Sequence, residues 1–135
     1  MISRCQNWQK KPEGKFIPIQ YLRGYWYHQE LPTDESVIGW NDQTIKDFHW
    51  QSWGSSDVFI AAFYYRIFYQ IAACNEFIRE TTDAKLNDRG VSGNLRTEIE
   101  FYRAEARFLR ALSYWHAMDL FANVRPVKVP KEGID

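Results

Sequence analysis

The sequence lacks most of the features that would assign a chain directly to a class of protein. Its 17 basic and 17 acidic residues balance to a net charge of zero, so the charge does not indicate a nucleic-acid partner. The three histidines, His28, His49 and His116, are isolated and no cysteine lies at ligand spacing from them, so no metal site is predicted. No glycine-rich phosphate loop and no GxSxG motif occur, and we predict no cofactor.

Long apolar runs are also missing. The best candidate, Val58 to Cys74, contains Arg66 and Gln70 in its middle, whereas a membrane-spanning helix needs ~20 predominantly apolar residues. The first residues show no apolar segment of a secretory signal. Cys5 is not preceded by a lipobox, so it is not predicted to carry a lipid. Cys74 is predicted to be a small buried side chain, and a disulfide between Cys5 and Cys74 stays open.

No set of residues has the arrangement of an active site. Asp34 and Glu35 form a carboxylate pair, but adjacent side chains usually point to different sides, and glycoside hydrolysis needs carboxyls on both sides of one bond. Glu105 is expected to pair with an arginine of its own helix. Three arginines on that helix, Arg103, Arg107 and Arg110, are expected to hold the structure together rather than bind an anion. We predict that the chain is not an enzyme.

Aromatic residues, in contrast, are abundant. They make up 17% of the chain, and five of the six tryptophans lie in the first 53 residues. The segment 25–56 is the least regular and the most aromatic, and we predict a long ordered loop over residues 31–56, within a loop region that extends over residues 1–56. A loop of that length is usually functional or held by its surroundings.

The stretch from Thr97 to Val127 predicts the longest helix, over about residues 96–122. One stripe of alternating three- and four-residue spacing and a second parallel stripe predict two apolar faces. The residues from 111 to 122 are apolar nearly all round, which predicts burial on several sides and a core position for Trp115. Asn123 is expected to take the left-handed turn that ends the helix, and Pro126 prevents its continuation.

A second helix is predicted over about residues 57–80, with Ser55, Ser56 and Asp57 as candidates for its N-cap. Residues 81–95 are polar and predict a surface loop, and residues 123–135 predict an extended tail. Two long helices joined by a loop form a helical hairpin, the unit of tetratricopeptide-type arrays. We therefore predict an all-α fold, a hairpin with long aromatic-rich loops, as part of a larger α fold.

The long helix and its exit turn also resemble a known family. The segment AEARFLRALSYWHAMDLFANVRPV, residues 104–127, is similar to a helix of the SusD/RagB-like nutrient-binding proteins, and ELPTDESVI, residues 30–38, resembles a segment that precedes their first paired helices. His49-Trp50 and Asn75 are similar to further positions of that family. The resemblance identifies residues 1–135 as an N-terminal portion of a SusD-like domain.

The resemblance implies a function without catalysis. Such a protein would bind a nutrient, above all a glycan or oligosaccharide, and pass it to a SusC-like TonB-dependent transporter. It would lie at the cell surface, on the outer membrane, held only by a lipid anchor outside this fragment. The alternative is a helical-repeat scaffold that binds another protein and no sugar, with its aromatic residues as interface anchors.

The candidate ligand site lies in the aromatic segment. An exposed aromatic ring can stack on the C–H face of a sugar, and nearby amides and carboxylates can bind its hydroxyls. Trp40, followed by Asn41 and Asp42, has this chemistry. The alternative is that Trp40 packs against the helices. Trp50 and Trp53, just before the second helix, are predicted to be packing residues.

Overall fold

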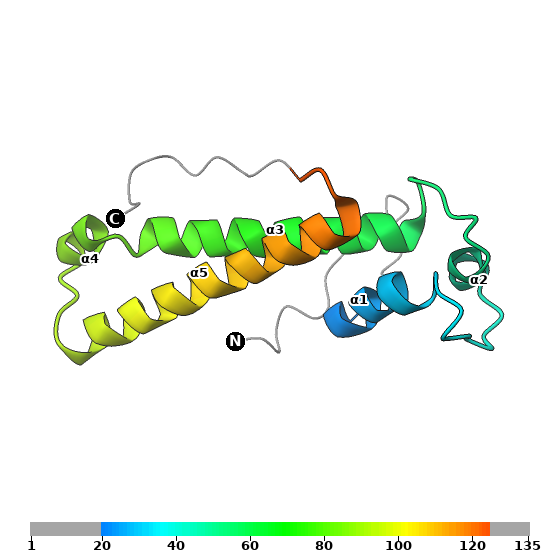
Figure 1. Ribbon diagram of the computed structural model, residues 1–135. Coiled ribbons are helices and arrows are strands. Elements are labelled where there is room, and N and C mark those ends of the chain that lie inside the picture. The colour runs from blue at the N-terminus through cyan, green and yellow to red at the C-terminus, as the bar shows by residue number, and fades with distance from the viewer. Residues whose placement is uncertain (1–19, 125–135) are drawn as a thin grey trace. The chain divides into compact units, whose positions relative to one another are not determined.

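The structure is a computed structural model that describes residues 20–124 (Figure 1). Five helices and no strand occur in that part of the chain: α1 (Tyr21–Glu30), α2 (Gln43–His49), α3 (Val58–Glu80), α4 (Asp83–Asp88) and α5 (Asn94–Phe121). The predicted all-α class is confirmed. The chain divides into two compact units, Met1–Arg66 and Ile67–Asp135, so the boundary falls within α3. Each unit is described by itself.

The first unit corrects the predicted loop of residues 1–56, because α1 and α2 form inside it. α1 has no side-chain cap at Gln20 and contains a glycine, Gly24, which weakens its intrinsic preference for a helix. Burial compensates, because Tyr27 and Leu31 reach the core of the unit. α2 is capped by Asp42, whose Oδ1 accepts from the Thr44 N–H at 3.0 Å.

The core of the first unit joins its three helical segments. Ile45 and Phe48 of α2 are buried with Tyr27 and Leu31, and Ile38, Phe59 and Ile60 pack against this cluster. Aromatic rings complete it: Tyr21 lies 5.2 Å from Phe63, and Tyr27 meets Phe59 edge to face at 6.1 Å, measured between ring centroids. The aromatic abundance of this region therefore serves partly as packing.

α3 begins where the sequence predicts. Asp57 Oδ1 accepts from the backbone N–H groups of Phe59 and Ile60 at 2.8 and 3.1 Å, so of the three candidates Asp57 is the N-cap. In the second unit α3 buries a line at helical spacing, Ile67, Ile71, Cys74 and Ile78. The predicted burial of Cys74 is confirmed. Cys5 lies outside the described residues.

The predicted surface loop 81–95 is also partly helical, since it contains α4. Leu86 is buried, and ion pairs hold α4 to the neighbouring helices. Glu80 at the end of α3 accepts from Lys85 at 2.6 Å and from Arg89, and these two hydrogen bonds lower the pKa of Glu80 to about 2. Arg96 of α5 donates to Asp83 at 2.8 Å. The connection is thus fixed at both ends.

α5 pairs with α3 through a face of small residues. Arg110 Nη1 donates to Asn75 Oδ1 of α3 at 2.9 Å, and Arg110 lies on the same helical line as the buried Ala106, Ser113 and Ala117. This line therefore faces α3. The predicted hairpin is present, and the structural role predicted for Arg110 is confirmed.

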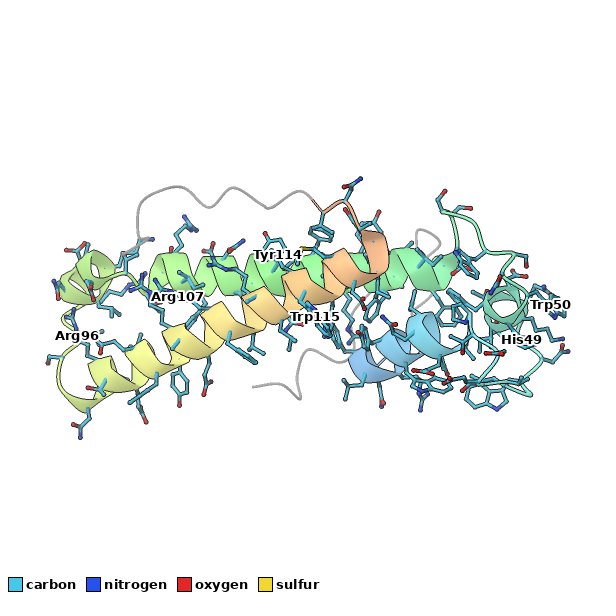
Figure 2. All side chains as sticks on the ribbon, viewed as in Figure 1. His49, Trp50, Arg96, Arg107, Tyr114 and Trp115 are labelled. Atoms are coloured by element: carbon cyan, nitrogen blue, oxygen red, sulfur yellow. The ribbon has the colours of Figure 1, made fainter. Side chains whose placement is uncertain are left out.

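The other predicted stripe of α5 is exposed, which corrects the prediction. Phe101, Phe108, Trp115 and Met118 are all exposed, and Trp115 lies on the side of α5 turned away from α3 (Figure 2). Trp115, 53% exposed, is not a core residue. A helix can bury only the faces that meet a partner, and the hairpin offers α5 one.

The end of α5 differs by one residue from the prediction. Ala122, rather than Asn123, has the positive φ, of 54°, and its N–H donates to the Met118 carbonyl at 2.9 Å. Pro126 and most of the predicted tail 123–135 lie outside the described residues. No helix in residues 20–124 combines the length and apolar character needed to cross a membrane.

Candidate functional site

The candidate site is the short helix α2 with the residues that flank it. Ile45 and Phe48 fix α2 to the core of the first unit. Gln51, with a positive φ of 54°, turns the chain away after the helix, and its Nε2 donates to the Pro32 carbonyl at 2.8 Å. α2 is thus held by the packing of its buried face and by the hydrogen bond that follows its C-terminal end. The side chains at its two ends therefore project from a helix in a fixed position.

Trp40 lies two residues before the N-cap of α2 and is 58% exposed. The alternative interpretation, in which Trp40 packs against the helices, is therefore wrong. Gly39 beside it has open space around the position of a Cβ, so nothing crowds this stretch from that side. An exposed indole in an open segment has the geometry that stacking on a flat apolar ligand face requires.

Asn41 and Asp42 both have local structural contacts. Asn41 Oδ1 accepts from Lys46 Nζ, and Asp42 Oδ1 caps α2. These contacts orient the two side chains and occupy one oxygen of each. Both residues are exposed, so the Asn41 amide N–H groups and Asp42 Oδ2 are the groups that remain for a ligand.

Trp50 is a candidate that the sequence interpretation missed. It caps the C-terminal end of α2 and is 60% exposed, and Figure 2 shows it with His49 at the outer side of α2. The predicted packing role of Trp50 is wrong. That of Trp53 is confirmed, since its ring lies 5.7 Å from that of Phe48. Trp50 follows directly after α2, a short helix that was not predicted although Asp42, Ile45 and Phe48 have the spacing of a capped helix.

His28 lies beneath the site, in the aromatic core. Its ring stacks on Phe63 at 5.0 Å and meets Phe48 edge to face at 5.1 Å. Burial lowers the pKa of His28, although its hydrogen bond to the Gly24 carbonyl and the charge of Asp57 raise it. The neutral ring therefore donates from Nδ1 to Gly24 O at 2.6 Å. It serves the packing of α1.

The remaining titratable groups do not assemble into a reactive site within the described residues. Asp34 and Glu35 are exposed on the turn after α1, where the Glu35 N–H donates to Thr33 Oγ1 at 3.2 Å. No three histidine, cysteine or acidic side chains between residues 20 and 124 lie close enough together to hold a metal ion.

Comparison with known proteins supports a relationship to SusD. The chain is 38% identical over 93 residues to the starch-binding protein SusD of Bacteroides thetaiotaomicron, a match that covers 68% of this chain and 15% of SusD. The chain thus matches less than a sixth of that relative's length. It matches no protein-family model, and no solved structure matches it. The match supports the SusD part of the predicted resemblance, and the RagB part stays a prediction.

Proposed function

We propose that this chain is part of a cell-surface protein that binds glycans and passes them to a SusC-like TonB-dependent transporter of the outer membrane. The observation that carries the proposal is the 38% identity over 93 residues to a protein named for binding starch. The binding requires no catalysis.

The surface around α2 provides the chemistry for binding. Trp40 and Trp50 are exposed at the two ends of a helix that is fixed by its buried face. Each indole can cover the C–H face of one sugar ring. Beside Trp40, the Asn41 amide can donate to a sugar hydroxyl and Asp42 Oδ2 can accept from one. Two rings at the ends of one helix favour an extended oligosaccharide over a single sugar.

Affinity electrophoresis in gels that contain soluble starch or another polysaccharide tests this proposal. We expect the chain to be retarded, and Trp40→Ala to abolish the retardation because it removes the stacking surface. Trp50→Ala should weaken it. Tyr69→Ala is the matched control, since Tyr69 is also exposed but lies on α3 in the second unit.

Three results would contradict parts of the proposal. Unchanged retardation of Trp40→Ala would show that Trp40 does not contact the glycan and would contradict the proposed site on α2. An absence of retardation in every polysaccharide would show that this chain does not bind glycans. Release of sugar products during the assay would show that the chain is an enzyme.

The alternative function, a helical-repeat scaffold for another protein, is favoured by a different observation. The exposed apolar stripe of α5 lies in the second unit and is built for contact with another helix. Retention of an integral outer-membrane transporter by the immobilised chain, in the absence of sugar, would favour this function or the transporter part of the first.

A further inference from the structure

His28 lies where the three helical segments of the first unit meet. Its ring stacks on Phe63 of α3 with the ring centroids 5.0 Å apart, and it meets Phe48 of α2 edge to face at 5.1 Å. Nδ1 donates to the Gly24 carbonyl of α1 at 2.6 Å. Nε2 is buried, and no atom of the described residues 20–124 forms a hydrogen bond with it. His28 is therefore a titratable group between apolar rings, with one nitrogen paired and the other unpaired.

We propose that protonation of His28 releases α2 from the core of the first unit, so that the candidate site on α2 is held in place at neutral pH and loosened in acid. The added proton has to go to Nε2, because Nδ1 already carries one. The charged ring would then bury a donor that lacks an acceptor, next to two apolar rings. Water can reach Nε2 only if one of those rings moves away, so the proton is taken up together with that movement.

Of the two helices that contact the His28 ring, α2 can move at the lower cost. α3 has 23 residues, whereas α2 has seven and is anchored in the core by Ile45 and Phe48. A short element with few buried contacts opens at a lower free energy than a long one. Movement of Phe48 displaces the whole of α2, and Trp40 and Trp50 flank that helix. The candidate site therefore loses its fixed arrangement when α2 is released.

The surroundings of His28 favour its neutral form. Burial has the largest effect on the pKa of His28 and lowers it below its ordinary value, while the hydrogen bond to the Gly24 carbonyl and the charge of Asp57 raise it. Asp57 is the N-cap of α3. Tyr21, whose ring lies against the same Phe63 ring, has its pKa raised to about 12, so it is uncharged in neutral and acidic solution.

α2 contacts His28 through the uncharged ring of Phe48. Three other side chains of α2 can carry a charge: Lys46, Asp47 and His49. The first two are hydrogen-bonded to Asn41 and Gln43, and the third is exposed at the outer side of α2 (Figure 2). None of the three is among the groups that shift the pKa of His28. Enclosure by the aromatic rings is therefore what opposes the uptake of the proton.

The pH at which α2 is released follows from the two states of His28. Above pH ~6.5, the ordinary histidine pKa, the ring is neutral whether α2 is in place or released, so the equilibrium between these states does not depend on pH. Below that value the hydrated ring of the released state takes up a proton before the enclosed ring does. The released population then rises by at most about ten-fold for each unit of pH, until the pKa of the enclosed ring is reached.

Amide hydrogen exchange of the whole chain, followed by NMR from about pH 7.5 to about pH 5, tests this coupling on both sides of the ordinary histidine pKa. The reporters are the amides of α2, among them the Trp50 N–H that donates to the Lys46 carbonyl. Their protection, corrected for the intrinsic exchange rate at each pH, should fall at least about five-fold. The Leu86 N–H of α4, which donates to the Thr82 carbonyl in the second unit, should not follow this change.

Two variants of His28 and a matched control assign the effect to one ring. His28→Phe keeps an aromatic ring and loses the titration, so the protection of α2 should become independent of pH. His28→Asn, whose amide can still donate to the Gly24 carbonyl, should do the same and covers the case that the larger phenyl ring distorts α1. His49→Asn removes an exposed histidine of α2 and should keep the pH dependence of the parent.

Three results would overturn the proposal: α2 protection in the parent that does not change with pH, His28 variants that keep the change, or a His49→Asn variant that loses it. The exchange measurement needs no glycan, whereas the effect on the site rests on the proposed function. A glycan that binds only when α2 is in place should lower the pKa of His28 further. If polysaccharides retard the chain but α2 protection is constant, the release is wrong and the function stands. Release of α2 without any retardation would show the reverse.

Discussion

α3 and α5 both carry long apolar stripes, yet they bury different kinds of side chain. In the second unit α3 buries its large isoleucines, with Ile67 and Ile71 fully buried, whereas α5 buries the small Ala106, Ser113 and Ala117 together with His116 and exposes Phe101, Phe108 and Trp115. Large side chains on one helix that face small ones on the other can pack without leaving gaps. The stripe of α5 that is buried is therefore the one whose small side chains match the large isoleucines of α3.

The two helices should differ most in how much stability is lost when a large side chain is replaced by alanine. Ile71→Ala removes a fully buried side chain and leaves a cavity, so we expect it to lower the free energy of unfolding by about 2–5 kcal/mol. Phe108→Ala, on the exposed face of α5, removes more atoms but should cost less than ~1 kcal/mol in the monomer. Urea denaturation at low protein concentration, followed by circular dichroism, measures both. Equal losses would show that the exposed stripe of α5 is part of the core.

Enlarging the alanines of α5 gives an intermediate effect. Ala117 is fully buried, and Ala117→Leu would have to place a larger side chain in a buried position, at a cost of about 1–3 kcal/mol. Ala111 has the same side chain on the exposed face, and Ala111→Leu should stay within about 0.5 kcal/mol of the parent. The same denaturation experiment separates them. If Ala111→Leu destabilised the monomer more than Ala117→Leu, the assignment of the two faces would be reversed.

The same contrast between α3 and α5 explains which features of the second unit could be predicted from the sequence. α3 could be predicted because its spacing and its cap at Asp57 agree. The existence of α5 could be predicted because its two apolar stripes keep their periodicity from residue 101 to residue 120. The burial of Trp115 could not, since periodicity identifies two apolar faces but not which one meets α3. Side-chain size carries that information, since it is small at Ala106 and Ala117 and large at Ile67 and Ile71.

In the first unit the helices α1 and α2 were not predicted, for two different reasons. α1 contains Gly24 and lacks a side-chain cap, so only burial of Tyr27 and Leu31 stabilises it, and burial depends on distant residues. α2 did leave a local signal: the cap Asp42 is followed by Ile45 and Phe48 at helical spacing. The predicted site residues Trp40, Asn41 and Asp42 flank that helix, and their binding role stays a prediction.

The smallest effect is expected from protonation of a residue on α5. His116 and Trp115 are neighbours in sequence with ring centroids 5.0 Å apart, but His116 is buried where Trp115 is exposed. Burial lowers the pKa of His116 below its ordinary value, and the charge of Asp119 opposes this only in part. Above pH ~6.5, the ordinary histidine pKa, the ring is neutral in both the folded and the unfolded chain, and the full stability is present.

As the pH falls below that value, the unfolded chain takes up the proton more readily than the folded one, so the free energy of unfolding decreases until the pH reaches the folded pKa. NMR titration should give a pKa below 6.5 for His116 and also for His28, whose pKa is lowered for the same reason. A pKa of His116 at or above 6.5 would mean that its ring is hydrated like an exposed one. His116 would then lie on the exposed face of α5 with Trp115, and the two faces of the helix would not differ in burial at this end.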